Sequence, residues 1–509
     1  MHIGIDVGGT NTDAVLVRGR TVVAAGKATT TADVTGGIVA AVSGLRHAFE
    51  PHEVTAVMIG TTHFVNAVVE GRNLARTAAV RLGLPATTAL PPFVDWPEQL
   101  RQAIGGHGYL CHGGHEYDGR VISPIKEDEL RAVAADLAAN DVESVAISSV
   151  FSLVSNEFER RAAEILTAEV PGLLVSFSHE IGRLGLLERE NATIINAALR
   201  VLAGQIADGL ADSLKAQGID APLYLSQNDG TLMDLDHARR HPVATFASGP
   251  TNSMRGGAFL SGTDDCAVID VGGTTTDIGV LHHGFPREVS SEVLINGVRT
   301  NFRMPDVLSA GLGGGSVVRD GEAGPDSVGF RLADEALVFG GGTLTATDVA
   351  VAGGLADIGD PSRVRHLDRT FVRDALDRIN TRIAERLDRT RTSPEPLPVV
   401  LVGGAGFLVQ RLDGASKIVR PEHHAFAGAI GAAIAQVGGE VDRVFTMAPG
   451  TRDEVLDGAR QEAVDRAVAA GARAGSVRIV EVEEIPLAYL PGNASRVRAR
   501  AVGDLLPGH

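Results

Sequence analysis

An eight-residue phrase occurs twice in this chain of 509 residues. The first copy is D-V-G-G-T-N-T-D at residues 6–13, and the second is D-V-G-G-T-T-T-D at residues 270–277. A short apolar run precedes each copy, and another apolar run follows it. Two apolar runs joined by a glycine-containing turn predict a β-hairpin, with glycine where the backbone needs a positive φ.

The residue types in both copies suit a phosphate group. Paired glycines let backbone N–H groups approach an anion, and threonine hydroxyls add further donors. An aspartate at a strand end can hold Mg²⁺ through water, because Mg²⁺ keeps several of its waters. One copy alone also fits an ordinary turn. Two nearly identical copies indicate a paired site that grips a nucleotide and its metal from two sides.

The residues between the two copies predict an α/β layer with partly parallel strands. Residues 127–140 and 156–168 have helical periodicity, and residues 144–151 and 173–178 are strand-like. Residues 194–214 predict a long helix that crosses between two lobes.

Further motifs follow the first copy in a fixed order. They are G-T-T-x-x-x-N-A-x-x-E from Gly60, E-R-x-x-x-T-x-x-N-A from Glu188, G-G-G-S from Gly313 and G-G-A-G from Gly403. With the repeated phrase, they resemble the actin-like ATPase superfamily of actin, sugar kinases and heat-shock chaperone ATPases. Within it, the chain resembles the A-subunit part of the hydantoinase/oxoprolinase family. Residues 227–230, Q-N-D-G, depart from the Ser-Asn-Gly-Gly loop that is typical of that family.

This resemblance implies an α/β fold with two duplicated RNase H-like lobes and a nucleotide cleft between them. We expect residues 1–190 to form the N-terminal lobe with an inserted region, and residues 191–262 to connect the lobes. Residues 263–438 are expected to form the second lobe, and residues 439–509 a small C-terminal α+β appendage. In that appendage, a helix with Val464 and Val468 facing inward precedes two strands.

The resemblance also assigns residues to roles. Asp6 and Asp270 organise Mg²⁺, and Thr10 and Thr274 join them as catalytic residues. The phosphates of ATP are cradled by Gly8, Gly9, Thr10, Asn11 and Thr12 from the first lobe and by Gly272, Gly273, Thr274, Thr275 and Thr276 from the second. Gly314 and Gly315 lie near the nucleotide, and Gly403, Gly404 and Gly406 border the adenosine. The substrate is expected near Thr61, Thr62 and Asn66.

The second aspartate of each copy has two possible roles. Asp13 or Asp277 could polarise a nucleophile, or each could form a hydrogen bond within its own hairpin. The structural role is the favoured interpretation.

A histidine- and cysteine-containing segment falls in residues 85–120, which we interpret as irregular because Pro-Pro and Gly-Gly pairs interrupt every pattern. His107, Cys111, His112 and His115 suggest a zinc site on composition. A polar loop whose histidines bind nothing is the favoured interpretation, because no predicted helix aligns them.

Charge and cysteine usage exclude several classes of function. The net charge of −17 argues against nucleic acid or an anionic membrane as the main partner. Two widely separated cysteines, Cys111 and Cys266, indicate a reducing compartment. The chain lacks a signal-peptide pattern and an apolar run of membrane-spanning length, so we expect a cytoplasmic protein.

The family implies ATP-dependent opening of a cyclic amide or imide, such as a hydantoin, 5-oxoproline or a related lactam. ATP phosphorylates the carbonyl oxygen in that reaction, and Mg²⁺ neutralises charge. A second subunit or a homo-oligomer is a further expectation. Two competing functions are a small-molecule kinase on the same fold and a nucleotide-driven activator or conformational switch.

Overall fold

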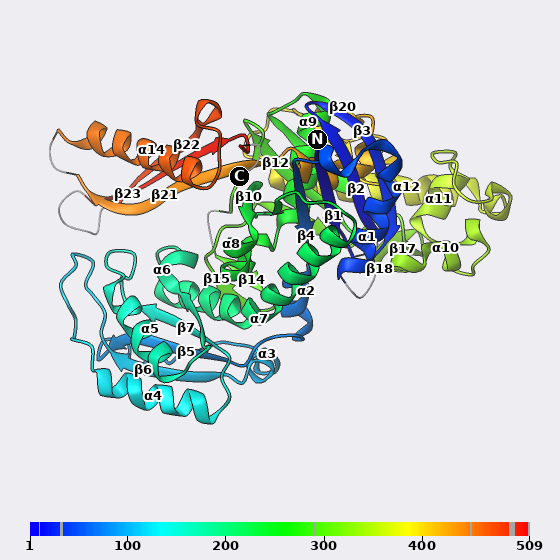
Figure 1. Ribbon diagram of the computed structural model, residues 1–509. Coiled ribbons are helices and arrows are strands. Elements are labelled where there is room, and N and C mark those ends of the chain that lie inside the picture. The colour runs from blue at the N-terminus through cyan, green and yellow to red at the C-terminus, as the bar shows by residue number, and fades with distance from the viewer. Residues whose placement is uncertain (10, 31–33, 290–291, 448–449, 488–493, 507–509) are drawn as a thin grey trace.

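The computed structural model describes residues 1–9, 11–30, 34–289, 292–447, 450–487 and 494–506 (Figure 1). Thr10, predicted to bind phosphate, lies outside the described residues. The chain forms two large mixed sheets, a smaller parallel sheet below them in Figure 1, and a C-terminal strand-and-helix region that projects to the left.

The first sheet has nine strands in the order β22-β23-β21-β10-β9-β4-β1-β2-β3. Its N-terminal strands are β1 (His2–Val7), β2 (Asn11–Arg18), β3 (Thr21–Thr29), β4 (Ala56–Thr61), β9 (Leu223–Ser226) and β10 (Thr231–Asp234). Strand β2 runs antiparallel to both β1 and β3, whereas β4 is parallel to β1 and β9 is parallel to β4.

The second sheet repeats this arrangement. Its strands are β11 (Cys266–Val271), β12 (Thr276–His282), β13 (Phe285–Pro286), β16 (Val307–Ala310), β19 (Leu397–Val402) and β20 (Ala415–Val419). The order β13-β12-β11-β19-β20 has the same strand directions as β3-β2-β1-β4-β9. Both predicted hairpins are therefore confirmed, and each occupies the same place in this five-strand order.

Two glycine-containing helices, α9 (Ser248–Ser261) and α13 (Ala427–Ala433), pack together between the sheets. A Cβ on Gly256 of α9 would lie 2.0 Å from the Ala427 carbonyl oxygen, and one on Gly431 of α13 would lie 1.9 Å from that of Asn252. A Cβ on Gly4 of β1 would lie 2.0 Å from the Ala429 carbonyl oxygen. The backbones approach this closely only because glycine has no side chain.

The smaller sheet has the order β6-β5-β7-β8, and all its pairs are parallel. Its strands are β5 (Thr77–Leu84), β6 (His107–His112), β7 (Ser144–Ser149) and β8 (Leu174–Phe177), and its helices are α3 (Glu98–Ala103), α4 (Glu127–Ala139) and α5 (Glu157–Glu169). The predicted parallel α/β layer is confirmed. The prediction that residues 85–120 are irregular is wrong for β6 and α3, because pairing with β5 imposes the strand in spite of the flanking glycines.

Helix α7 (Leu186–Ala216) links the smaller sheet to the large ones and begins before the predicted start at residue 194. It is the one helix in the described part of the chain that is long and apolar enough to span a membrane, and 56% of its most apolar window is buried inside the protein. We therefore interpret it as a core helix. Short elements complete this region: α1 (Val34–Gly44), α2 (His63–Glu70), α6 (Ser178–Ile181), α8 (Leu235–Arg240), β14 (Val293–Ile295) and β15 (Val298–Thr300).

The second sheet is covered by further elements at the right of Figure 1. These are β17 (Ser316–Arg319), β18 (Glu322–Ser327), α10 (Leu332–Glu335), α11 (Ala346–Ala352) and α12 (Arg369–Thr390). Helix α12 places Val372, Ile379 and Ile383 in the core of this half of the molecule.

The C-terminal region contains β21 (Gln436–Thr446), α14 (Arg452–Ala469), β22 (Arg478–Pro486) and β23 (Ala494–Gly503). It extends the first sheet, because β21 pairs in parallel with β10. The inward face of α14 also differs from the prediction: Ala459, Ala463 and Ala467 are buried, whereas Val468 is 38% exposed. Small residues face inward because α14 packs closely on β21, where a Cβ on Gly439 would lie 2.2 Å from the Ala463 carbonyl oxygen.

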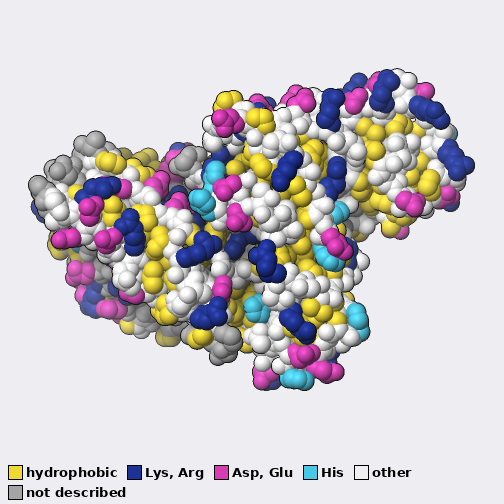
Figure 2. Space-filling model, turned by 90° about the horizontal axis from the view of Figure 1, so that it is seen from above, with side chains coloured by type: hydrophobic (Ala, Val, Ile, Leu, Met, Phe, Trp, Pro, Cys, Tyr) yellow, Lys and Arg dark blue, Asp and Glu magenta, His cyan; other side chains and the backbone are white. Residues whose placement is uncertain are grey.

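Charged side chains of both signs are distributed over the face seen in Figure 2, with several Lys and Arg side chains near its centre. The net negative charge of the chain therefore does not form a single acidic surface on that face.

Candidate active site

The two hairpins have the same register and the same closing bond. Asp6 lies opposite Asp13, and Asp270 lies opposite Asp277. The Gly8 N–H donates to the Asn11 carbonyl at 3.0 Å, and the Gly272 N–H donates to the Thr275 carbonyl at 2.9 Å. The repeated phrase thus produces one local structure twice.

The predicted reason for the glycines in these turns is wrong, because none of Gly8, Gly9, Gly272 and Gly273 has a positive φ. The turns close through the bonds just described without left-handed backbone. Gly9 and Gly273 are exposed, and a Cβ on either would meet no atom within 4 Å. These glycines therefore border open space in which a ligand could approach the backbone.

Two predicted phosphate ligands have protein partners instead. Thr12 and Thr276 are fully buried. The Thr12 hydroxyl lies 3.1 Å from that of Thr30, and the Thr276 hydroxyl donates to the Leu312 carbonyl at 2.6 Å. Both side chains hold their hairpin against a neighbouring segment. The remaining predicted cradle residues in the described chain lie at the turns and are exposed or half-buried: Gly8, Gly9, Asn11, Gly272, Gly273, Thr274 and Thr275.

The carboxylates of the two hairpins come together from opposite sheets. Burial, followed by repulsion from Asp13 and then from Asp270, raises the pKa of Asp6 to about 8. Burial raises the pKa of Asp277 to about 6, although a hydrogen bond from Ser309 opposes the shift. Burial also raises the pKa of Asp270, against a hydrogen bond from Ser253. Part of Asp6 and Asp270 stays accessible, yet protein atoms surround both carboxylates closely.

Asp13 and Asp277 both have partners within their own sheets. Lys27 Nζ lies 2.6 Å from Asp13 Oδ1, and the Ser309 hydroxyl donates to Asp277 Oδ1 at 2.5 Å. Burial raises the pKa of Asp13, and the Lys27 charge opposes that shift. These contacts favour the structural role for both residues, so Asp6 and Asp270 are the carboxylates better placed to serve a ligand.

The residues present fit Mg²⁺ held through water. Repulsion between buried carboxylates with raised pKa values is relieved by a cation, and Mg²⁺ prefers carboxylate oxygens and its own waters. Among the described residues, no group of three or more His, Cys, Asp or Glu could hold a metal directly. The site therefore suits a hydrated cation bridged to a bound phosphate.

Glycines make room for both carboxylates. A Cβ on Gly428 of α13 would lie 2.2 Å from Asp6 Oδ2, and a Cβ on Gly403 would lie 2.3 Å from Asp270 Oδ1. Gly403 also has a φ of +84°, which favours glycine. Gly404 and Gly406 border open space. The predicted adenosine motif thus lies directly beside Asp270.

The glycine run that follows β16, residues 313–315, forms hydrogen bonds to the turn of the second hairpin. The Gly314 N–H donates to the Gly272 carbonyl at 3.0 Å, and the Gly315 N–H donates to the Gly273 carbonyl at 2.7 Å. Their N–H groups are therefore occupied, and these two residues position the turn.

The predicted substrate residues lie beside the first hairpin, because Thr61 at the end of β4 is opposite Val7 of β1. The Thr61 hydroxyl lies 2.8 Å from His63 Nδ1 and its backbone N–H donates to the Ser248 hydroxyl. The Asn66 side chain donates to the Thr62 hydroxyl at 3.5 Å. Thr61 is 2% exposed, so only its neighbours are accessible to a substrate.

Sequence reasoning missed Asn252. This residue of α9 is fully buried, and within the described part of the chain neither its amide nitrogen nor its amide oxygen has a hydrogen-bond partner. A Cβ on Gly60 would lie 2.5 Å from Asn252 Nδ2 and 3.1 Å from Asp6 Oδ1, so the amide and the carboxylate approach the same face of Gly60. An unpaired buried amide is costly, and a ligand or its water would satisfy it. The only sequence signal was a polar residue among the glycines of this helix.

Arg189 and Asn196, which belong to the motif that begins at Glu188, are buried in α7. Arg189 donates to the Ser178 hydroxyl and to the Ser149 carbonyl. Asn196 donates to the Ser176 hydroxyl. This motif therefore fixes α7 to the smaller sheet.

The zinc hypothesis is wrong for the described residues, which include the whole segment. Cys111 is buried in the core of the smaller sheet, and His115 packs on Phe158 with 4.4 Å between ring centroids. His112 forms an ion pair of 2.7 Å with Glu129. Cys111 and His112 are neighbours in strand β6, where successive side chains point to opposite faces of the sheet, so they cannot bind one metal ion together.

Two family models match successive parts of the chain. Residues 2–170 match the family model of the hydantoinase/oxoprolinase N-terminal region, and residues 189–357 match the hydantoinase/oxoprolinase model. The chain belongs to the hydantoinase/oxoprolinase family. The resemblance predicted from the motifs is confirmed, and both hairpins of this family member lie within the matched regions.

Curated relatives of this family member include two enzyme subunits. The chain is 28% identical over 420 residues to caprolactamase subunit alpha of Pseudomonas jessenii, covering 76% of this chain and 59% of the relative. It is 26% identical over 372 residues to the acetone carboxylase beta subunit of Xanthobacter autotrophicus, covering 65% of this chain and 51% of the relative. The chain spans 34–59% of the lengths of the curated relatives it matches.

Solved structures confirm a mixed α/β fold with parallel sheets. The ATP-dependent caprolactamase from Pseudomonas jessenii superposes with a TM-score of 0.80 at 19% identity, covering 100% of this chain and 88% of that chain. A nucleotide-free acetone carboxylase structure gives a TM-score of 0.70 at 19% identity with the same coverage. These likenesses establish the fold of this family member.

Proposed function

We propose that this chain is the ATP-binding part of an enzyme that opens a cyclic amide or imide. The observation that carries the proposal is the pair of nearly identical hairpins, which lie in two sheets with a common five-strand order and whose Asp6 and Asp270 carboxylates are close enough to repel each other. The similarity to an ATP-dependent caprolactamase favours a lactam, hydantoin or 5-oxoproline ring as the substrate.

We also infer that the two halves are duplicated RNase H-like lobes of the actin-like ATPase fold. The common strand order and directions of β3-β2-β1-β4-β9 and β13-β12-β11-β19-β20 support this. Duplication would explain why the same turn faces the site from both sides.

In the proposed reaction, the ring carbonyl oxygen attacks the γ-phosphorus of ATP, and the bond to the bridging oxygen of ADP breaks. The product is an O-phosphorylated ring whose carbon is a better electrophile. Water adds to that carbon and the C–N bond of the ring breaks, which leaves a free amine and an acyl phosphate. A second water hydrolyses the acyl phosphate, so that phosphate and the ring-opened acid leave. Such a sequence needs precise positioning and charge stabilisation more than covalent catalysis by the protein.

The chain's own groups would provide these functions. The exposed turns at Gly9 and Gly273 offer backbone N–H groups to phosphate oxygens, while Thr274 offers a hydroxyl. Asp6 and Asp270 would accept hydrogen bonds from water on Mg²⁺, which when bound neutralises phosphate charge. The unpaired Asn252 amide would form a hydrogen bond with a further water or with the carbonyl oxygen of the substrate.

A partner subunit is part of this proposal, because the relatives are named as subunits of caprolactamase, acetone carboxylase and acetophenone carboxylase. The carboxylase relatives also favour one competing function, in which this chain is part of a carboxylase that acts on a ketone. A kinase that releases a stable phosphoester and a nucleotide-driven switch are two more functions that this fold could support.

The test is phosphate release from ATP by the purified chain with Mg²⁺, over a panel of hydantoins, 5-oxoproline, lactams and simple ketones. Stimulation by a ring, with the ring-opened acid as product, supports the proposal. Stimulation only by ketones would reassign the chain to carboxylase chemistry, and a stable phosphoester would indicate a kinase. ATP binding without stimulation by any compound would favour the switch or an obligatory partner.

A further inference from the structure

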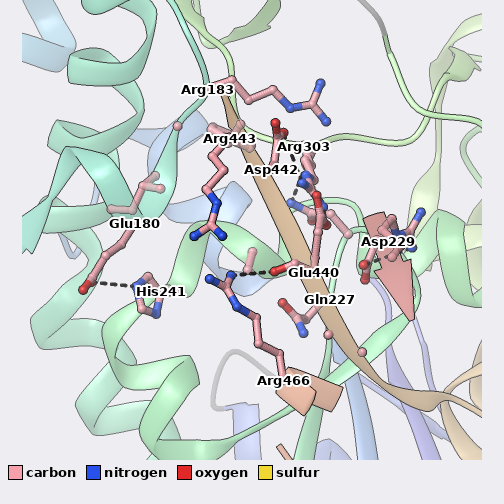
Figure 3. Close-up of a pocket in the computed structure, with 18 of the residues that line it drawn as sticks. Glu180, Arg183, Gln227, Asp229, His241, Arg303, Glu440, Asp442, Arg443 and Arg466 are labelled. Atoms are coloured by element: carbon pink, nitrogen blue, oxygen red, sulfur yellow. Dashed lines mark hydrogen bonds and ion pairs between the residues drawn. The ribbon is translucent and has the colours of Figure 1, made fainter. Parts of the chain in front are cut away.

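A cavity of about 430 Å³ lies away from the paired hairpins, between the smaller sheet and the C-terminal region (Figure 3). Its walls come from α6, the turn after β9, α8, β21, α14 and β23. Among the described residues that line it, none belongs to either hairpin. The cavity is therefore separate from the candidate active site.

Two guanidinium groups on one wall share a single carboxylate. Arg443 of β21 and Arg466 of α14 lie 2.6 Å and 2.7 Å from the two oxygens of Glu462. Two positive charges against one negative charge leave this wall with an excess positive charge. In Figure 3, both guanidinium groups point into the same central space that the His241 ring borders. Arg466 also donates to the Glu440 carbonyl. About half of each arginine side chain is exposed, so each can present further N–H groups to a ligand beside these partners.

The opposite wall presents imidazole nitrogens without partners. The His179 side chain is 9% exposed, and its Nε2 has no hydrogen-bond partner in the described structure. The nearest carboxylate oxygen, Glu180 Oε1, is 3.8 Å away, which is too far for a hydrogen bond. His179 Nδ1 lies 2.5 Å from Glu159, which fixes the ring orientation. His241 Nδ1 is also buried without a partner, while its Nε2 lies 3.3 Å from Glu180.

Other arginines of the cavity are already neutralised. Arg496 lies 2.7 Å from Asp442, Arg303 pairs with Glu440 and Asp442, and Arg500 lies 3.1 Å from Asp229. This network holds β21 and β23 against the rest of the molecule. Arg183 also lines the cavity and pairs with Glu288, but its buried Nε has no hydrogen-bond partner among the described residues. The groups with polar atoms left for a ligand are thus Arg183, Arg443, Arg466 and the two histidines.

Part of the remaining wall is apolar and is formed by Leu153, Ile181, Val243, Ala244 and Phe302. Polar side chains, among them Glu180, Gln227 and Thr231, line the rest. A ligand with one anionic end and an apolar body would match the two arginines and the apolar part of the wall. Forked guanidinium groups match the two oxygens of a carboxylate.

We propose that this cavity binds a small organic carboxylate, with its charged end on Arg443 and Arg466 and its apolar body along the wall near Val243 and Phe302. The site goes beyond the proposed function, because it shares no residue with the hairpins and its occupation requires neither ATP nor turnover. An anionic product of ring opening would belong to this ligand class.

The test is isothermal titration calorimetry of the full chain with pentanoate, without nucleotide or Mg²⁺. Saturable binding is expected, together with weaker binding of inorganic phosphate and no binding of pentylamine, whose charge is opposite. Arg443→Gln and Arg466→Gln are each expected to weaken pentanoate binding about tenfold, as is typical for loss of a charge-assisted hydrogen bond. Arg378→Gln is the matched control, because this equally exposed arginine pairs with Glu322 outside the cavity.

Three results would overturn the proposal: no saturable heat with pentanoate, binding that both cavity variants retain, or tighter binding of phosphate than of pentanoate. Both cavity arginines are half exposed, so the variants are expected to fold, and thermal melts will verify this. Because nucleotide is absent, the outcome is independent of whether the chain turns over ATP.

Discussion

At the scale of single residues, the candidate active site depends on buried carboxylates whose charged forms are unfavourable in the unliganded protein. Asp6 has a pKa of about 8 because the protein surrounds it and other carboxylates lie nearby. Gly428 leaves the space that the Asp6 carboxylate fills, and Gly403 does the same for Asp270. The cation that accompanies a bound nucleotide would stabilise the charged carboxylates. The site is therefore less stable when it is empty than when it is occupied.

Replacing Asp6 by asparagine is expected to stabilise the unliganded protein near pH 8 while abolishing Mg²⁺-dependent phosphate release. The folded-state pKa of Asp6 lies above its unfolded value of about 4, so the folded state binds the proton more tightly. Stability contributed by this group falls as pH rises from about 4 to about 8, by at most roughly 1.4 kcal/mol per pH unit. Thermal melts of both proteins across this range measure the difference.

Asp326→Asn is the control for that comparison, because Asp326 is exposed and pairs with Arg319 at 2.6 Å. Melting curves of wild type and Asp6→Asn that stay parallel across this pH range would contradict the assigned environment of Asp6.

Gly403 and its neighbour Gly404 provide a matched pair of substitutions. Gly403→Ala is expected to lower the free energy of unfolding by about 1–3 kcal/mol, because its φ is +84° and its Cβ would overlap Asp270. Gly404→Ala is expected to leave stability unchanged, since its Cβ meets no protein atom, yet to weaken ATP binding if adenosine lies there. Denaturant unfolding and nucleotide titration measure the two effects. Equal ATP affinity in Gly404→Ala and wild type would remove this residue from the nucleotide site.

At the scale of elements, close backbone contacts join the two sheets. Helices α9 and α13 meet through Gly256 and Gly431, where any side chain would overlap a carbonyl group. This contact positions Asn252 and Gly428 at the site together. Packing of elements, rather than any local motif, therefore brings the two hairpins into one arrangement.

Gly256→Ala is expected to destabilise the protein by about 1–3 kcal/mol, because its Cβ would lie 2.0 Å from the Ala427 carbonyl oxygen and force α9 and α13 apart. The same substitution at Gly458 of α14 is the control. That Cβ meets nothing within 4 Å, so the gain in helix propensity of about 1 kcal/mol should dominate. Urea unfolding of both variants measures the contrast, and equal stability of the two would show that α9 and α13 can separate freely.

A buried ion pair joins the smaller sheet to α7. Arg81 of β5 lies 2.5 Å from Glu190 of α7, and both side chains are almost fully buried. Arg81→Met is expected to destabilise by about 3–5 kcal/mol, because it leaves the Glu190 carboxylate buried and unpaired. Adding Glu190→Gln should recover much of this loss, since the second change removes the charge. Chemical denaturation of both single variants and the double variant tests this, and strictly additive losses would argue against the pair.

At the scale of the whole molecule, the proposed site belongs to both halves of the chain. Addition of a non-hydrolysable ATP analogue with Mg²⁺ is expected to slow hydrogen exchange in residues 6–13 and in residues 270–277 together. Mg²⁺ without the nucleotide should not slow exchange in both hairpins. Residues 77–84, which form β5 of the smaller sheet, should exchange at the same rate with and without the analogue and serve as an internal reference. Protection of only one hairpin would contradict a shared nucleotide site and would favour separate roles for the two copies.

The sequence by itself determined the local structures. Alternation, turn residues and the repeated phrase predicted both hairpins, the parallel layer of residues 127–178 and the family, because these signals depend on neighbours in the chain. Asp6 and Asp270 were identified for the same reason. The zinc hypothesis and the inward face assigned to Val468 show the limit of local patterns, since each depended on which surface a distant segment covers.

Only the tertiary structure decided what those elements build. Pairing of β21 with β10 made the C-terminal region part of the first sheet, and packing of α9 on α13 placed the unpaired Asn252 beside Asp6. The cavity near Arg443 and Arg466 forms where segments far apart in the chain meet. Burial and close packing select such contacts from many possible pairings that a local pattern cannot distinguish.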